Sequence, residues 1–220
     1  MLVAMAGGMT DGTTTEATSI DREPSSQRAV RKDILTRLKL ETASEHSAIE
    51  DAARIMHPRL TLEEYRGYLE KSYGYYAAVE GLLCGLGVWD ALELPEEERL
   101  KLPLLARDLE ALGGSPSSVV ICDAPPVLRS VAEAAGCAYV LEGSTLGGKV
   151  ISRHVRHRMG DKVPRSFLDC YGENIGNNWQ AFRAALLRFA KSRSTEDEMV
   201  SGAKETFQTF TRWLAPAQRH

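Results

Sequence analysis

Apolar side chains recur at intervals of three and four positions over most of the chain, and this spacing is typical of amphipathic helices. The first such stretch begins at Ile34 and includes Leu38, Ile49 and Met56. It predicts one long helix over about 31–56. Pro58 would stop this helix, because proline has no backbone N–H to continue the helical hydrogen bonds.

A second helix is expected to start near Thr61, because Thr61-Leu62-Glu63-Glu64 has the form of an N-terminal capping arrangement. A stripe of aromatic and aliphatic residues follows it at helical spacing, and such a stripe is more typical of a core than of a binding site. The stripe consists of Tyr65, Leu69, Tyr73, Tyr76 and Leu83.

The rest of the chain is also mainly helical by period. A charged amphipathic stretch begins at Pro95 and stops at Gly113-Gly114. The only β-branched run, Val119-Val120-Ile121, is predicted to be a loop, because one short run cannot form a sheet. Further helices are expected at 127–159, 179–190 and 196–214, with a loop over 167–176. About six to eight helices and no strand result, so the predicted fold class is all-α, a single-domain bundle of many helices.

The length and composition fit this single domain. A chain of 220 residues with 43% hydrophobic and 26% charged residues can bury one ordinary core. Residues 1–30 are rich in Thr, Ser, Asp and Gly, so we predict a flexible N-terminal tail there. The helical domain is expected over 31–214, with a C-terminal tail at 215–220.

Charge and cysteine content narrow the class of protein. A net charge of −3 argues against nucleic acid as the main partner. No run approaches the ~20 apolar residues of a membrane span. The apolar start Met1–Gly8 lacks the basic residues of a signal peptide. The cysteines are spread out without a CxxC pair, which is typical of reduced cytosolic thiols, and they are Cys84, Cys122, Cys137 and Cys170. We therefore expect a cytoplasmic protein.

His46 is the first candidate for chemistry. It lies in the middle of the apolar pattern of the first predicted helix, and Glu50 follows one helical turn later, within reach of the imidazole. A histidine that binds a metal through one ring nitrogen usually donates its other N–H to a carboxylate or carbonyl. By spacing alone, a His/Glu pair of this kind is most often an ordinary surface or core contact.

The segment Gly143-Ser144-Thr145-Leu146-Gly147-Gly148-Lys149 is the second candidate. Each glycine inside a helix costs about 1 kcal/mol relative to alanine, so a reason for them is expected. Gly143, Gly147 and Gly148 fall near one helix face, which could present bare backbone to a flat ligand or allow close helix packing. The spacing also matches part of a phosphate-binding loop, but Val150 stands where that motif needs Ser or Thr and no strand precedes it.

Together these segments resemble the haem oxygenases. Residues 38–46 with Glu50 are similar to the proximal helix of that family, and residues 139–148 are similar to its distal helix. A later pattern is similar to bacterial members, especially those that accompany bacteriophytochromes, and consists of Phe167, Tyr171-Gly172, Gly176, Trp179 and Phe182. The resemblance runs from about 34 to 214.

This resemblance implies a haem-oxygenase-like helical fold and the cleavage of haem b, which is both substrate and prosthetic group, to biliverdin, CO and Fe²⁺. It implies that His46 binds the iron on the proximal side and that Glu50 is its hydrogen-bonding partner. On the distal side, Gly143, Gly147 and Gly148 would leave room for O₂. Many family members have an aspartate where this chain has Ser144. The serine hydroxyl can hold a water but supplies no negative charge.

The resemblance also suggests contacts at the pocket edge and partners. Lys39 matches a family contact to a haem propionate, and Tyr139, Arg183 and Lys149 are further candidates, although each could simply be a solvated side chain. A basic run at 153–158 could be a solvated face or a docking patch for an acidic electron donor. Electrons would come from an external reductase or ferredoxin, and biliverdin could pass to a bacteriophytochrome.

Two other functions stay open at the level of sequence. Ser144 in place of the acid is compatible with a non-catalytic haem sensor or carrier on the same fold. A helical enzyme or interaction module that binds no haem is the more distant alternative. Turnover of added hemin distinguishes a haem sensor or carrier from an oxygenase. The spectral effect of His46→Ala tests whether the chain binds haem at all.

Overall fold

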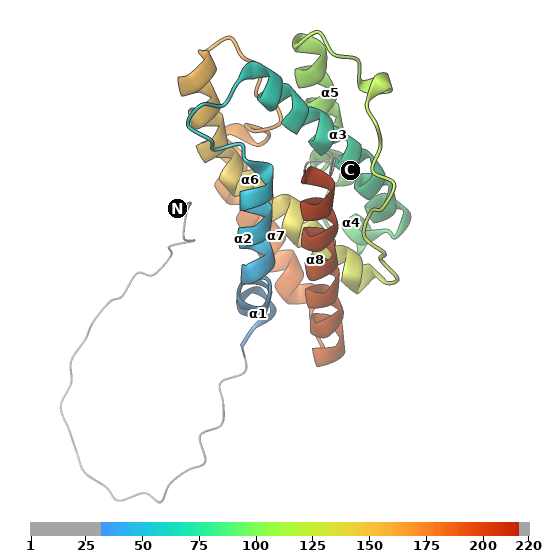
Figure 1. The fold of residues 1–220 in the computed structure, drawn as a ribbon. Helices are drawn as coiled ribbons and strands as arrows, with labels where there is room; N and C mark the ends of the chain where they lie inside the picture. The colour runs from blue at the N-terminus through green and yellow to red at the C-terminus, as the bar shows by residue number, and fades with distance from the viewer. Residues whose placement is uncertain (1–31, 216–220) are drawn as a thin grey trace, which may run out of the picture. The chain divides into compact units, whose positions relative to one another are not determined.

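The computed structural model describes residues 32–215, which contain eight α-helices and no strand (Figure 1). The predicted all-α class is therefore confirmed. The predicted tails at 1–30 and 215–220 lie outside the described residues, apart from Ala215. The elements are α1 (Ile34–Glu41), α2 (Ala43–Ala53), α3 (Leu62–Gly85), α4 (Val88–Ala91), α5 (Leu102–Ala111), α6 (Val131–Met159), α7 (Ile175–Phe189) and α8 (Arg193–Leu214), with 3₁₀ turns at Glu96–Glu98, Pro116–Ser118 and Gly172–Asn174.

The first predicted helix is two helices, and this part of the prediction was wrong. Thr42 interrupts it with φ −116° and ψ 12°, and the Thr42 hydroxyl donates to the Leu38 carbonyl oxygen at 2.7 Å. A threonine that bonds back to the preceding turn competes with regular helix geometry. The second half, α2, ends at Ala53 because Arg54 adopts a left-handed conformation with φ 48°. Pro58 therefore comes after the end of the helix and does not cause it.

The predicted start of the second helix is confirmed. Thr61 accepts a hydrogen bond from the Glu64 backbone N–H, and the Glu64 carboxylate accepts one from the Thr61 backbone N–H. This reciprocal capping box satisfies two donors that a helix end would otherwise leave unpaired. Other predicted boundaries shift by several residues. Ser130 caps α6, so 127–130 is not helical, while α7 starts at Ile175 and α8 at Arg193, both earlier than predicted.

Helices α6 and α8 form the central pair of the bundle, and α6 crosses behind α8 in Figure 1. At their crossing, a Cβ on Gly136 would collide with the backbone of Met199, and a Cβ on Gly202 would collide with the backbone of Glu133. Each helix thus has a glycine where the other backbone passes, which permits a very close approach. Helix α8 also packs on α2 and α3, so it connects the first helices to α6.

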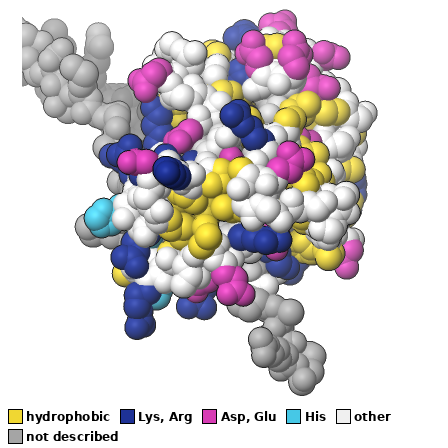
Figure 2. Space-filling view, turned by 90° about the horizontal axis from the view of Figure 1, so that it is seen from above, with side chains coloured by type: hydrophobic (Ala, Val, Ile, Leu, Met, Phe, Trp, Pro, Cys, Tyr) yellow, Lys and Arg dark blue, Asp and Glu magenta, His cyan; other side chains and the backbone are white. Residues whose placement is uncertain are grey.

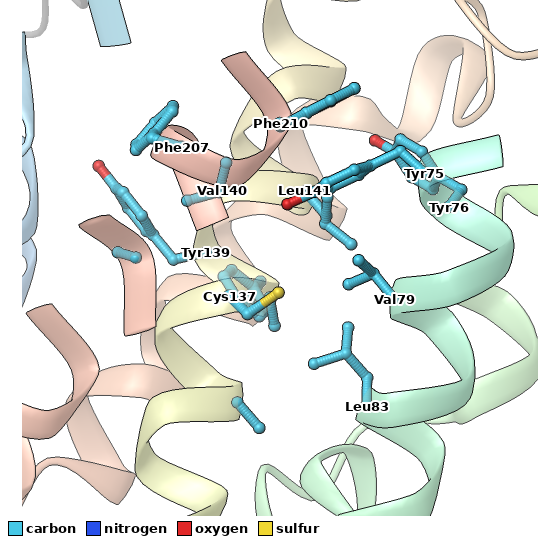
Figure 3. Packing of buried hydrophobic residues seen from close by; sticks show 14 of the residues in the cluster. Tyr75, Tyr76, Val79, Leu83, Cys137, Tyr139, Val140, Leu141, Phe207 and Phe210 are labelled. Atoms are coloured by element: carbon cyan, nitrogen blue, oxygen red, sulfur yellow. The ribbon is translucent and has the colours of Figure 1, made fainter. Parts of the chain in front are cut away.

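Side chains from α3, α6 and α8 meet in the core (Figure 3). Tyr75 of α3 stacks on Phe210 of α8 with ring centroids 4.0 Å apart. The Tyr75 hydroxyl reaches the Thr206 carbonyl and the Thr209 hydroxyl, so its polar end is satisfied inside the apolar core. The predicted stripe on α3 is core at Tyr65, Leu69, Tyr76 and Leu83, while Tyr73 is half-buried.

Charged side chains contribute one buried clamp at the start of the bundle. Arg37 of α1 is only 4% exposed and pairs with Glu41, Glu196 and Asp197, which attaches α1 to α8. On the face seen in Figure 2, Lys and Arg alternate with Asp and Glu around apolar patches, so neither sign dominates there. Among residues 32–215, no helix is both long and apolar enough to cross a membrane.

Candidate active site

His46 lies on the middle of α2 and is accessible. Its side chain is 52% exposed, and its Nδ1 is 3.8 Å from the Glu50 carboxylate one turn later. The edge of the Phe207 ring, from α8, contacts the imidazole at a centroid distance of 5.7 Å and an interplanar angle of 83°. Phe207 packs against the ring and the Glu50 carboxylate lies just beyond hydrogen-bond distance of Nδ1, while Nε2 has no hydrogen-bond partner among residues 32–215. An imidazole held in this way can bind a metal through Nε2.

His46 was predicted to lie in the middle of the apolar face of a helix, and in the structure that face is only partly buried. No residue of α2 is buried, and Ile49 and Ala53 are only half-buried. Helix α2 packs on α8, and Phe207 of α8 contacts the His46 ring, so His46 lies on the α8 side of α2 and is still 52% exposed. An accessible imidazole beside the Phe207 ring is a suitable contact for a large flat ligand.

The three glycines of the 143–148 segment on α6 have different surroundings. A Cβ on Gly147 would meet no atom within 4 Å, and one on Gly143 would meet only the Trp179 ring, at 3.8 Å. A Cβ on Gly148 would lie 2.5 Å from the Leu168 carbonyl oxygen, which is too close for any side chain. Close packing therefore explains why residue 148 is a glycine. Packing does not require a glycine at position 143 or 147, so the accessible backbone there needs another reason.

Ser144 lies between two of these glycines and belongs to a small hydroxyl network. Its Oγ donates to the Leu141 carbonyl oxygen at 2.7 Å and lies 3.2 Å from the Tyr76 hydroxyl. Burial raises the pKa of Tyr76 well above its usual value, and the hydrogen bond with Ser144 opposes this only in part. Both groups are neutral near pH 7, so together they can orient a water or another small polar ligand beside the glycines.

Tyr76 was not identified as a site residue from the sequence. It belongs to the predicted core stripe, and its ring is indeed buried against Phe167 and Phe210. Only the tertiary structure shows that its hydroxyl reaches Ser144, because the two residues lie 68 positions apart in the chain. The sequence contains no signal that separates Tyr76 from the other tyrosines of α3.

Tyr139 and Arg183 come together near the glycines. Tyr139 is buried one turn before Gly143, and its ring lies 5.9 Å from that of Trp179 on α7. Burial raises the pKa of Tyr139, and the nearby Arg183 guanidinium opposes the shift. Arg183 itself is exposed. Trp179, Tyr139 and Arg183 thus form an aromatic wall with a cationic rim beside the α6 glycines.

Lys39 is not on the same helix as His46, which differs from the predicted arrangement. It is exposed in the last turn of α1, and Thr42 separates that helix from α2. The basic run at the end of α6 is mostly solvent-accessible, with Arg153, Arg156 and Arg158 exposed. His154 differs, because its Nε2 lies 3.1 Å from the His57 carbonyl oxygen and links α6 to the α2–α3 connection.

Helix α8 connects the two halves of the site. It packs on both α2 and α6, and its buried Phe207 contacts His46 and lies near Tyr139 and Val140 in Figure 3. A separate cavity of about 210 Å³ lies at the carboxyl end of α2, lined by Arg54, Tyr68 and Lys71 among others, and includes neither His46 nor the glycines. The candidate site is therefore the surface between α2 and α6 that α8 braces.

Comparison with known proteins agrees on one family. The family model described as Heme oxygenase matches residues 32–216. A heme oxygenase of Xanthomonas campestris pv. campestris is 31% identical over 121 residues, which is 55% of this chain and 71% of the relative.

Two solved structures share the fold. The NO- and CO-bound heme oxygenase of Neisseria meningitidis has a TM-score of 0.70 at 22% identity, covering 85% of this chain and 95% of its own. The heme oxygenase of Leptospira interrogans has a TM-score of 0.66 at 21% identity, covering 84% and 99%.

Proposed function

The chain belongs to the haem oxygenase family, and we propose that it oxidises haem to biliverdin, CO and Fe²⁺ with His46 as the protein ligand of the iron. The observation that carries the role of His46 is its accessible imidazole, backed by the Glu50 carboxylate at 3.8 Å. The haem supplies the redox chemistry with O₂ and electrons from an external reductase or ferredoxin. The protein binds, orients and shields it.

The residues present fit this group. On the α2 side, Glu50 lies 3.8 Å from His46 Nδ1, so a small side-chain rotation would let it accept the Nδ1–H, fix the tautomer and leave Nε2 for the metal. On the α6 side, Gly147 opens onto free space and Gly143 presents backbone close to Trp179. A planar ring can approach the backbone closely at Gly147, because no atom lies within 4 Å of the position that a Cβ would take there.

Ser144 and Tyr76 are the groups that we assign to holding water and moving a proton on the α6 side. The hydroxyls lie 3.2 Å apart, and Ser144 donates its hydrogen to the Leu141 carbonyl, so the Tyr76 hydroxyl donates to Ser144 and one Ser144 lone pair remains to accept a hydrogen bond from water. Where many relatives have an aspartate, this pair provides no negative charge. The proton must therefore be held by hydroxyl groups and water.

At the edge of the site, cationic side chains would bind the haem propionates. Arg183 is exposed beside the buried Tyr139, which makes it the best-supported candidate. Lys39 is exposed on α1 and remains a second candidate, together with the half-buried Lys149. Charge-assisted bonds between such cations and carboxylates are the strong form of hydrogen bond.

We include two partners and a location in the proposal. The exposed arginines Arg153, Arg156 and Arg158 would dock an acidic electron donor, since a local excess of positive charge accelerates association with acidic proteins. Biliverdin would pass to a bacteriophytochrome, which rests on the resemblance to phytochrome-associated members. A cytoplasmic location is supported by the cysteines, all of which are unpaired.

Hemin titration tests the assignment of His46. The wild-type chain is expected to give a Soret band that saturates at one hemin per chain, and His46→Ala should shift this band and weaken binding. Added imidazole should restore the spectrum of His46→Ala, because it replaces the missing ligand. The matched control is His157→Ala, which removes an exposed histidine from the end of α6 and should have the wild-type spectrum. An unchanged spectrum in His46→Ala would refute the assignment.

Aerobic reduction then tests the reaction. With ascorbate or a reductase, the Soret band should decay as a product absorbing in the red accumulates, and chromatography should identify it as biliverdin. Stable haem binding without ring opening would instead show a haem carrier or sensor on this fold.

A further inference from the structure

A buried polar cluster lies against α6 immediately beside the glycine segment. The carboxylate of Glu142 is 2% exposed and accepts hydrogen bonds from Arg99 Nη1, Lys101 Nζ and the Tyr171 hydroxyl, each at 2.9 Å. The Lys101 ammonium also donates to the Arg99 carbonyl oxygen at 2.7 Å and the Tyr171 hydroxyl at 2.8 Å. Two buried cations therefore donate to the one carboxylate of Glu142.

The partners of Glu142 come from two separate parts of the chain. Arg99 and Lys101 belong to the segment before α5, which Glu80 of α3 also holds by accepting the Lys101 backbone N–H at 2.6 Å. Tyr171 belongs to the connection between α6 and α7. One carboxylate on α6 therefore binds side chains from both neighbouring segments, and its position depends on both.

Stability alone is a weak reason for such a cluster. Removing charges from water is costly, and well-packed apolar side chains of similar volume are often as stable as a buried ion pair or more stable. Moreover, Arg99 Nε is buried and has no acceptor among residues 32–215. A cluster that satisfies its donors incompletely is better explained by what it positions.

The place of Glu142 on α6 indicates that the cluster positions the glycine segment that follows it. At Gly136 the helix is fixed by its close crossing with α8, and at Gly148 it is fixed by the backbone of Leu168. Between these contacts, Gly143 and Gly147 have no side chains that could pack against a neighbouring element. Glu142 is the charged anchor in this interval, directly before Gly143.

We propose that Glu142 is a positioning residue that fixes the rotation and rigidity of α6 over residues 143–148, and thereby determines which edge of the haem ring faces the reacting oxygen. The chemical part of this inference rests on the proposed function. The mechanical part does not, because it concerns the haem-free protein. Glu142 itself lies beside the site and acts through the backbone that follows it.

Hydrogen–deuterium exchange of the haem-free protein tests the mechanical part. Glu142→Gln keeps the shape of the side chain but removes its charge, and amides in 143–148 should exchange about tenfold faster than in the wild type. The matched control is Glu196→Gln, which removes a carboxylate of similar burial, paired with Arg37 at 3.0 Å, from α8. It should leave exchange at 143–148 unchanged. Wild-type exchange in Glu142→Gln, or equal acceleration by Glu196→Gln, would overturn the proposal.

A second variant covers the case in which Glu142→Gln does not fold. Tyr171→Phe removes the hydroxyl that lies 2.9 Å from both Glu142 oxygens and accepts from Lys101 Nζ, but keeps the carboxylate and both cations, so it should accelerate exchange in the same segment by a smaller factor. Unchanged exchange in that variant would count against the proposal as well.

The ratio of biliverdin isomers tests the chemical part. Glu142→Gln should give a broader mixture than the wild type, whereas Glu196→Gln should give the wild-type ratio. An unchanged ratio beside faster exchange would overturn the link to chemistry. If the wild type made no biliverdin, the proposed function would fail, while the exchange result would still decide the role of Glu142.

Discussion

Gly147 and Gly148 are neighbours on one helix, and the structure gives them opposite responses to the same substitution. A methyl group at Gly147 would enter open space, whereas one at Gly148 would lie 2.5 Å from the Leu168 carbonyl oxygen. Both substitutions remove a glycine from a helix interior, so both gain about 1 kcal/mol of helix propensity. This gain cancels when the two variants are compared, and only the clash at Gly148 remains.

The magnitude of that clash follows from what the methyl group meets. Its neighbour is a backbone atom, which cannot rotate away as the end of a flexible side chain would. Overpacking of this kind costs about 1–3 kcal/mol, so Gly148→Ala should be less stable than Gly147→Ala by that amount. For a chain of this size, each kcal/mol corresponds to roughly 2–4 °C in Tm. Gly147→Ala should melt slightly above the wild type and Gly148→Ala below it.

The assay is urea or thermal unfolding of the haem-free variants, followed by hemin titration. Gly147→Ala should bind hemin more weakly or turn it over more slowly despite its greater stability, because its methyl group occupies the face that we assign to the ligand. Equal stabilities for the two variants would refute the packing reason for Gly148. A stabilised Gly147→Ala with wild-type hemin binding and turnover would refute the role of the Gly147 surface.

Three further predictions concern other parts of the molecule. Burial raises the pKa of the Cys137 thiol from 9.0 to about 12, so above pH 9 the unfolded chain loses a proton that the folded chain keeps. The free energy of unfolding should therefore fall by about 1.4 kcal/mol per pH unit between pH 9 and about 12. Urea unfolding of Cys137→Ala should show a smaller fall over this range. Thr61→Ala removes the capping box of α3 and should cost about 1 kcal/mol, measured by urea unfolding, and no loss would contradict the capping geometry. Tyr76→Phe removes the hydroxyl that contacts Ser144 and should slow turnover at least severalfold while leaving the hemin Kd within about twofold, and an unchanged rate would exclude Tyr76 from proton transfer.

The helices could be predicted wherever local chemistry decides them. The period of apolar residues identifies α3, α6 and α8, and the Thr61–Glu64 pair fixes the start of α3 because both partners of the capping box are close in sequence. The break at Thr42 and the end at Arg54 could not be predicted in the same way. Each depends on a single residue whose conformation is set by packing, and most threonines and arginines continue a helix.

The site residues, too, could be predicted only where they lie close together in the sequence. His46 and the glycines could be recognised as candidates because they lie in two continuous segments, and the resemblance then gave their roles. Tyr76 and the partners of Glu142 were missed, because their contacts join residues 29 to 68 positions apart. A glutamate directly after the apolar run Ala134–Leu141 was a usable signal that a buried charge needs partners, although it does not say which ones.

The segment 143–148 has to meet two demands that conflict. A bare backbone is needed on the ligand side, but each glycine that provides it lowers the stability of the helix by about 1 kcal/mol and removes a side chain that could hold the helix in place. Rigidity must then come from residues that do not face the ligand. In this chain the close contact of Gly148 with Leu168 fixes one end of the segment, and the hydrogen-bonded Glu142 fixes the other. Substitutions at such positions should therefore alter which product forms before they alter whether haem binds.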